Sequence, residues 1–340
     1  MKTLQIHGSA GDSTILVGAK LPDFRIPAEK AVIIADATVT QFHREDFPPL
    51  EVIEIGSGER IKNLDTVKGI YEKLLELEVD RSCLILGIGG GVVCDITGFV
   101  ASTYLRGLRF GLVPSTLLSQ VDAGVGGKNG VNLGGYKNMV GTFNQPEFVI
   151  CDTNLLDTLP QREILSGLAE IVKHAAIGNE YLFSYLEENW EKALRLDTEV
   201  IEKLVYDSLL VKSSIVNRDE KERGERRKLN FGHTFGHAIE KASGVSHGEA
   251  VSAGMVLASA LSRKRGYLSS KDTERIEALL KQLKLPARLP VNRKSLLDAI
   301  RKDKKRNGNN INFVLLQVIG CAVVEEIALK ELEDTALEMI

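Results

Sequence analysis

Three of the six histidines in the chain fall within one short segment, at positions 233, 237 and 247. In a helix, His233 and His237 lie four residues apart and face the same way, as in known zinc-binding pairs. Glu170, from another part of the chain, could add an oxygen ligand. Two imidazoles and one carboxylate leave one position of a divalent metal open, which is typical of a catalytic site. The spacing predicts a metal site but does not choose two ligands from His233, His237 and His247.

The segment Leu168–His174 (LAEIVKH) places three polar side chains on one predicted helix face. Glu170, Lys173 and His174 are at helical positions i, i+3 and i+4, so they are neighbours. Two interpretations stay open from the residues alone. Glu170 and Lys173 are a metal ligand and a substrate contact, or they form an ordinary ion pair at the surface.

A glycine-rich turn, GIGGGVVCD at residues 87–95, follows a predicted strand and opens a predicted helix. Exposed N–H groups and the helix dipole at such a turn favour a phosphate. Val92 stands at the sixth position of the GxGxxG pattern, so the ordinary dinucleotide fingerprint fails. The segment predicts a phosphate or dinucleotide site, with a tight strand–helix turn as the alternative.

Two lysines lie among glycines in the segment from Asp122 to Asn138, at Lys128 and Lys137. Glycines offer little apolar surface, so these lysines could face an anionic ligand. A surface loop with solvated lysines is the alternative. Basic residues also gather at 218–228 and at 302–306, and most such runs are solvated faces, although those beside the histidines could bind a phosphate or a carboxylate.

Length and composition limit the class of protein. The chain has 340 residues, a net charge of −3 and 44% hydrophobic residues. This is enough for two domains, and it excludes a disordered chain or a general nucleic-acid binder. No apolar run is long enough for a membrane helix, and the start is unlike a secretion signal, so we expect a cytoplasmic protein. The four scattered cysteines predict reduced thiols.

The pattern of segments predicts two domains, residues 1–160 and 161–340. The first alternates short apolar strands with helices, which is typical of an α/β domain with a mostly parallel sheet and a nucleotide-binding glycine turn. The second is dominated by amphipathic helices from residue 162 to 283, and we expect it to be mainly α-helical. One further strand is predicted at residues 312–318, near the end of the chain.

Several long motifs together resemble the 3-dehydroquinate synthase family of sugar phosphate cyclases. They are the run at 92–143, LAEIVKH at 168–174, LNFGHTFGHAIE at 229–240 and HGEAVSAGM at 247–255. The resemblance extends from about Ile34 to Gly320. It implies an NAD- and zinc-dependent (or cobalt-dependent) lyase of the shikimate pathway. This enzyme converts 3-deoxy-D-arabino-heptulosonate 7-phosphate to 3-dehydroquinate and phosphate.

The resemblance also implies roles for individual residues. The metal ligands are Glu170, His233 and His247, so that His237 becomes a substrate contact. The other implied substrate and catalytic residues are Asp122, Lys128, Lys137, Asn138, Lys173, Lys212, Arg226, Asn230 and Lys304 (or Lys305), with Arg106 reaching the neighbouring subunit of a homodimer. The implied NAD contacts are Asp36, Glu59, Lys62, Gly91, Val92, Val93, Cys94, Asp95, Ser115, Thr116, Leu155 and Thr158, together with Lys128 and Lys137.

Three departures from the family pattern stand out. Cys94 replaces a usual glycine, Thr38 replaces a usual asparagine, and the segment between Glu240 and His247 is short. The alternatives to the main prediction are another sugar phosphate cyclase, a metal-dependent dehydrogenase of the glycerol dehydrogenase type and a catalytically silent binding protein. The number of predicted anion-binding residues argues against the dehydrogenase.

Overall fold

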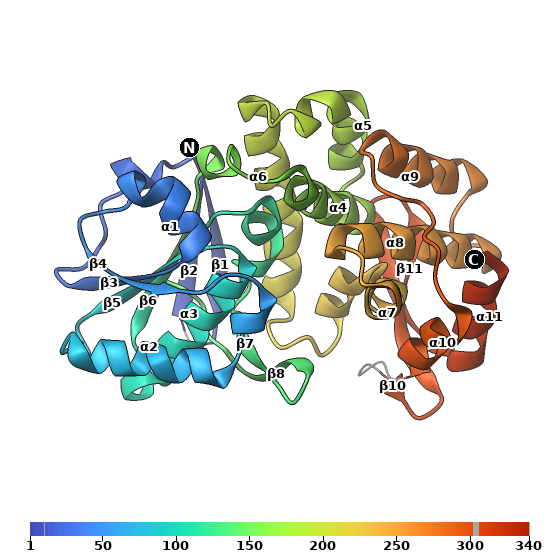
Figure 1. The fold of residues 1–340 in the computed structure, drawn as a ribbon. Helices are drawn as coiled ribbons and strands as arrows, with labels where there is room; N and C mark the ends of the chain where they lie inside the picture. The colour runs from blue at the N-terminus through green and yellow to red at the C-terminus, as the bar shows by residue number, and fades with distance from the viewer. Residues whose placement is uncertain (10, 302–305, 340) are drawn as a thin grey trace. The chain divides into compact units, whose positions relative to one another are not determined.

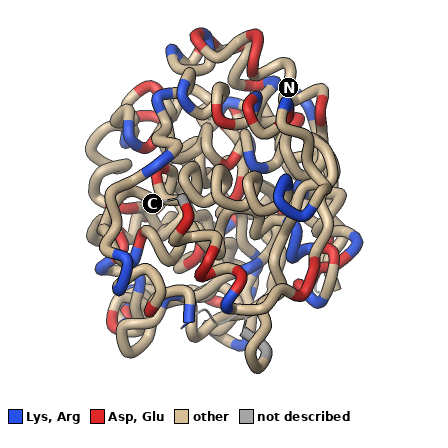
Figure 2. Tube along the Cα trace, turned by 90° about the vertical axis from the view of Figure 1, so that its right-hand side faces the viewer, with Lys and Arg blue, Asp and Glu red and all other residues tan. Residues whose placement is uncertain are grey.

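The computed structural model describes residues 1–9, 11–301 and 306–339. It divides into two compact units, Met1–Leu159 and Pro160–Ile340, which Figure 1 shows in blue to green and in green to red. This boundary lies one residue before the predicted one. Within the described residues, none of the helices has the length and apolar character needed to cross a membrane. Acidic and basic residues are interspersed along the chain (Figure 2).

A seven-stranded sheet forms the centre of the first unit, in the order β1-β2-β9-β6-β5-β3-β4. Every neighbouring pair is parallel except β1 and β2, which form an antiparallel hairpin. The strands are β1 Lys2–Gly8, β2 Gly11–Val17, β3 Ala31–Asp36, β4 Glu51–Ile55, β5 Leu84–Gly89, β6 Arg109–Pro114 and β9 Phe148–Cys151. The interior strand β5 is buried along its whole length, as expected for a parallel sheet covered on both faces. The mostly parallel α/β fold is therefore confirmed.

The helices of this unit are α1 Ala37–His43, α2 Leu64–Glu76 and α3 Gly91–Thr103. In α2, Val67, Ile70 and Leu74 are buried at helical spacing, and the side chain of Asn63 caps the first turn by accepting from Thr66 N at 2.9 Å. The predicted helix over residues 92–105 ends two residues early, because Tyr104 has an extended backbone with ψ of 132° and Leu105 a left-handed one with φ of 49°.

The glycine–lysine segment forms a β-hairpin, which corrects the interpretation of this region as a loop. Strand β7 (Lys128–Leu133) pairs antiparallel with β8 (Tyr136–Phe143). Gly134 and Gly135 make the connecting turn with φ of 59° and 79°, the backbone that a two-residue hairpin favours. Glycines are therefore needed here for the turn as well as for any ligand.

The second unit is mainly helical, as predicted. Its helices are α4 Gln161–Gly178, α5 Glu180–Leu194, α6 Thr198–Arg218, α7 His233–Ser243, α8 His247–Lys264, α9 Ser270–Gln282, α10 Arg293–Arg301 and α11 Leu329–Met339. The single predicted strand is β11 (Asn310–Val318), but the structure adds β12 (Cys321–Ala328) and the short β10 (Arg306–Asn307) to form an antiparallel sheet. Strand β12 was missed because its short apolar stretch gives way to charged residues at Glu325 and Glu326.

Candidate metal centre and nucleotide-binding turn

Glu170 is a completely buried carboxylate in the middle of α4. A buried charge needs a compensating partner, and Lys173, one helical turn later and 1% exposed, forms an ion pair with its Oε2. The pair therefore lies inside the second unit, and the interpretation as a surface ion pair is wrong.

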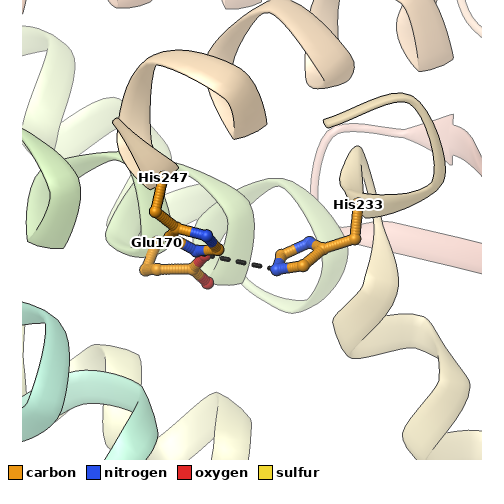
Figure 3. A group of neighbouring side chains, drawn as sticks. All are labelled: Glu170, His233 and His247. Carbon is orange, nitrogen blue, oxygen red and sulfur yellow. Dashed lines mark hydrogen bonds and ion pairs between the residues drawn. The ribbon is translucent and has the colours of Figure 1, made fainter. Parts of the chain in front are cut away.

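Two histidines approach the other oxygen of this carboxylate (Figure 3). His247 Nε2 lies 3.0 Å from Glu170 Oε1, and His233 Nε2 lies 3.4 Å from the same atom. One atom from each residue falls within 4.8 Å of the other two. Two imidazole nitrogens and one carboxylate oxygen are ligands that suit Zn²⁺ or a similar divalent ion. The three residues predicted as ligands are thus brought together from α4, α7 and α8.

Glycines at two helix contacts allow this convergence. A Cβ on Gly254 would lie 2.1 Å from the carbonyl oxygen of Gly232, so α8 packs directly on the residue preceding His233. A Cβ on Gly248 would lie 2.5 Å from Ser166 Cα, so the start of α8 touches the backbone of α4. Larger residues would separate these helices.

The short connection before His247 is closed by two capping structures. Gly244 ends α7 with φ of 68°, a left-handed cap. Ser246 begins α8 in a capping box, in which its hydroxyl accepts from Glu249 N while Glu249 Oε2 accepts from Ser246 N at 2.9 Å. The short segment that departs from the family pattern therefore closes with regular helix caps at both ends. It places His247 as the first residue of α8.

The pKa values of His233 and His247 are shifted in opposite directions. Burial holds the pKa of His233 well below its usual range. Burial also acts to lower the pKa of His247, but hydrogen bonds to Glu170 and Glu240 outweigh it and raise this pKa to about 9. His233 Nδ1 lies 3.1 Å from the carbonyl oxygen of Phe231, which orients the ring with Nε2 toward Glu170. A cation bound by the three residues would displace the proton of His247.

His237 lies outside this three-residue group. Its side chain is exposed, and its ring stands perpendicular to that of His233 with 5.2 Å between the centroids. Helical spacing alone favours His237 as a partner of His233. In the structure the partner of His233 is His247, which approaches from a different helix. Residue spacing within one helix cannot predict such a contact.

The predicted anion-binding residues Lys212 and Arg226 are both buried in the second unit. Arg226 Nη1 donates to the carbonyl oxygen of Glu220 at 2.5 Å, and Asn230 Nδ2 donates to Glu222 Oε1 at 2.6 Å. Buried cations of this kind need anionic or carbonyl partners, so they are suited to hold an anionic ligand.

Asp219 organises the loop that carries these groups, a role that its position in a charged run does not reveal. Its carboxylate accepts backbone N–H groups from Arg223 at 2.9 Å, Gly224 at 2.7 Å and Arg226 at 3.0 Å. Burial acts to raise the pKa of Asp219, but these hydrogen bonds outweigh it and lower the pKa from its usual value. The only sequence signal for this role is an aspartate at a helix end with a glycine five residues later.

In the first unit, Asp36 and the glycine turn meet at the carboxyl ends of neighbouring strands. The chain leaves β3 toward β4 on one side and leaves β5 toward β6 on the other, so the order of strands reverses between them. Such switch points bind nucleotides in open α/β sheets. Asp36 Oδ1 caps α1 by accepting from Thr38 N at 2.9 Å and Val39 N at 3.0 Å. Thr38, the departure beside it, forms a 2.9 Å hydrogen bond with Ser57.

The glycines of the turn permit close packing. A Cβ on Gly89 would lie 2.5 Å from Val93 Cγ2, and one on Gly91 would lie 2.9 Å from Ala123 Cβ. Gly90 precedes α3 without a capping side chain, so the first N–H groups of that helix can receive a phosphate. Cys94 is buried with its thiol 3.7 Å from the Gly89 carbonyl oxygen, and burial raises its pKa. The thiol thus points into the core.

Lys62 joins two more predicted contacts beside this turn. It is buried, forms an ion pair with Asp95 and donates to Asn138 Oδ1 at 2.7 Å. Glu59 Oε1 accepts from Asn132 Nδ2 at 2.7 Å. The contacts connect the start of α3 to the β7–β8 hairpin, so several predicted residues form one cluster in the first unit.

The other predicted residues of the first unit have varied positions. Lys128 and Lys137 are exposed on the hairpin, Arg106 is exposed with φ of 68°, and Asp122 is half-buried in the helical turn Ser119–Ala123. Ser115 N donates to the Gly89 carbonyl oxygen at 2.9 Å, and a Cβ on Gly90 would lie 3.3 Å from Thr116 Cγ2, so both adjoin the glycine turn.

Three predictions are less direct. The side chains of Leu155 and Val93 are buried in the core, so only their backbones are suited to meet a cofactor. The predicted substrate residue Lys304, and its alternative Lys305, lie outside the described residues.

An α/β unit with a glycine turn at its strand switch point, followed by a helical unit with a His–His–carboxylate group, is the fold of solved sugar phosphate cyclases. The structure resembles a 2-deoxy-scyllo-inosose synthase solved with carbaglucose-6-phosphate, NAD⁺ and Co²⁺ (TM-score 0.88, 25% identity, 100% of both chains). It also resembles the 2-epi-5-epi-valiolone synthase of Streptomyces hygroscopicus subsp. jinggangensis 5008, solved with NAD⁺ and Zn²⁺ (TM-score 0.88, 27% identity, 100% of this chain and 99% of the other).

The chain belongs to the 3-dehydroquinate synthase family. The family model for the N-terminal part matches residues 52–166, and the model for the C-terminal part matches residues 167–306. The 3-dehydroquinate synthase of Halorhodospira halophila (strain DSM 244 / SL1) is 42% identical over 322 residues, which cover 92% of this chain and 91% of the relative. These matches favour the predicted activity over the other cyclases.

The similarity to dehydrogenases concerns the fold alone. A probable glycerol dehydrogenase from Sinorhizobium meliloti 1021 has a TM-score of 0.66 and 16% identity, over 92% of this chain and 90% of the other. This chain therefore has the predicted two-domain plan in common with such enzymes. The similarity does not support a dehydrogenase reaction.

Proposed function

We propose that this chain converts 3-deoxy-D-arabino-heptulosonate 7-phosphate to 3-dehydroquinate and phosphate, with NAD and a divalent metal as cofactors. The observation that carries the proposal is the convergence of Glu170, His233 and His247 in a chain of this family. The solved cyclases that resemble it contain NAD⁺ with Co²⁺ or Zn²⁺, which supports both cofactors.

Glu170, His233 and His247 would hold the metal, which when bound would supply Lewis-acid activation of a substrate hydroxyl. Lys173 neutralises the second oxygen of Glu170, so the carboxylate keeps a fixed orientation. His237 is exposed beside His233, where it is suited to contact the substrate and to transfer a proton.

The glycine turn, Asp36, Lys62 and the segments around Ser115 and Thr158 would hold NAD. NAD held there would supply reversible hydride transfer, so no net accumulation of NADH is expected. The N–H groups at the start of α3 are positioned for the pyrophosphate, and Asp36 lies where such folds bind the ribose of the adenosine half.

Basic residues would bind the two anionic ends of the substrate and stabilise charge during phosphate elimination. Each charge-assisted hydrogen bond of this kind contributes roughly 1.5–3 kcal/mol when it is well placed. The residues proposed for the substrate are Asp122, Lys128, Lys137, Asn138, Lys173, Lys212, Arg226, Asn230 and His237.

Arg106 is proposed as a phosphate contact to the site of a second subunit in a homodimer. Its exposed side chain follows Leu105, and both residues have left-handed backbones with φ of 49° and 68°. Such strained positions cluster at functional sites. A cytoplasmic location remains a prediction.

Supplying the heptulosonate phosphate with zinc and substoichiometric NAD tests the proposal. The expected result is release of phosphate and formation of 3-dehydroquinate in many turnovers for each NAD. Stoichiometric accumulation of NADH would instead support a dehydrogenase. If the enzyme released phosphate only from a different sugar phosphate, it would be one of the other sugar phosphate cyclases.

A further inference from the structure

A buried imidazole with both ring nitrogens engaged lies at the end of α1, outside the residues assigned above. His43 is 8% exposed. Its Nδ1 lies 3.3 Å from Asp46 Oδ2, and its Nε2 lies 2.8 Å from Thr158 Oγ1. All three residues belong to the first unit. The sequence gives no signal for this arrangement, because Thr158 is more than a hundred residues away from His43.

The chemistry of the three groups determines which atoms carry protons. An ionised carboxylate can only accept, so the proton of a neutral His43 lies on Nδ1 and points to Asp46. Nε2 then carries a lone pair and accepts the hydroxyl proton of Thr158. Since a hydroxyl has one proton, Thr158 keeps only lone pairs for a third group.

The hydroxyl is accessible to such a group. Thr158 is exposed, while the imidazole that fixes it is buried. Helix α1 connects His43 to Asp36 at its other end, and Asp36 lies where the adenosine ribose is expected in this type of sheet. A ligand group that meets Thr158 must therefore donate a hydrogen bond. The 6-amino group of adenine is a donor, whereas the 6-oxo group of hypoxanthine is an acceptor.

We propose that Asp46 and His43 are positioning residues that make Thr158 a hydrogen-bond acceptor, and that Thr158 thereby selects a 6-amino purine in the dinucleotide over a 6-oxo purine. This inference rests on the proposed use of NAD. Adenine and hypoxanthine differ at position 6. A 6-oxo group would face the Thr158 oxygen, and neither oxygen would carry a proton for a hydrogen bond between them.

The test compares the dissociation constants of NAD and nicotinamide hypoxanthine dinucleotide for the full metal-loaded chain, at about pH 8 where an ordinary imidazole is neutral. We expect wild type to bind NAD roughly tenfold more tightly, the effect of one hydrogen bond. In Asp46→Ala, the imidazole proton can move to Nε2 and the hydroxyl can turn. The preference should then fall below about threefold with little change in NAD affinity.

Three further variants complete the test. Glu45→Ala is the matched control, since Glu45 is an exposed neighbour in the same helical turn, Arg44–Asp46, and should keep the preference of wild type. His43→Phe also frees the hydroxyl and should abolish the preference. Thr158→Val should weaken NAD binding by roughly tenfold and leave the analogue almost unchanged.

Two results would overturn the inference while leaving the proposed function intact. One is a wild type that binds both dinucleotides equally well, and the other is a full preference retained in both Asp46→Ala and His43→Phe. A wild type that binds neither dinucleotide would overturn the proposed function, and this inference with it.

Discussion

Gly248 and Ser166 are in backbone contact, so close that a Cβ on Gly248 would lie 2.5 Å from Ser166 Cα. His247 precedes Gly248, and Glu170 lies one helical turn after Ser166. The distance of 3.0 Å between His247 Nε2 and Glu170 Oε1 therefore depends on the approach of α8 to α4. A packing detail of two helices sets the geometry of the candidate metal centre.

Gly248→Ala should weaken metal binding by roughly 10- to 100-fold, the range for groups that orient a ligand. The added methyl group would push the start of α8 away from α4 and carry His247 away from Glu170. Competitive titration with a zinc chelator measures the affinity. Gly69→Ala is the matched control, because a Cβ at Gly69 in α2 meets nothing within 4 Å. Unchanged zinc affinity in Gly248→Ala would show that His247 does not depend on this contact.

His233→Ala should lose metal and activity together, because it removes one of the three ligands. His237→Ala should retain stoichiometric metal while turnover falls by roughly 100-fold or more, as expected for loss of a proton-transfer group. Metal analysis of the purified variants and a phosphate-release assay provide the two readouts. Stoichiometric metal in His233→Ala would contradict the assignment of ligands.

Lys128→Ala should raise the KM for the sugar phosphate by roughly 10- to 100-fold, through loss of a charge-assisted hydrogen bond. The dissociation constant of NAD should change far less. Steady-state kinetics and NAD titration separate these effects. An equal loss of both would instead assign the β7–β8 hairpin to the cofactor.

Asp219→Asn should destabilise the protein by about 1–2 kcal/mol near neutral pH, since an amide cannot accept all three backbone N–H groups. The pKa of Asp219 is lowered in the folded state, so its stabilisation is present above the pKa of the unfolded chain and is lost as pH falls through the folded value. Denaturant unfolding of both proteins between pH 7 and about 3 should show the difference shrinking in acid. A difference independent of pH would mean that the carboxylate charge is not involved.

Regular elements were predictable where the pattern was local. The buried face of α2 and the apolar strand β5 follow from periodicity and run length. The β1–β2 hairpin and β8 were not predicted, because β8 is exposed on most of its residues and lacks an apolar face. The choice of His247 over His237 came from family resemblance, since it depends on packing between α7 and α8 that helical spacing cannot reveal. Asp219 accepts from backbone groups at irregular spacing, and His43 contacts a residue far away in the sequence. Neither arrangement was therefore predicted.

The ion pair of Lys173 with Glu170 has a consequence for the order of assembly. With its charge already balanced inside the second unit, the carboxylate does not require a cation for the helices around it to form. We therefore expect chelation to abolish activity while circular dichroism stays near that of the loaded form, and the melting temperature to fall only by the stabilisation that metal binding itself adds. The polypeptide can fold first and bind its metal ion afterwards.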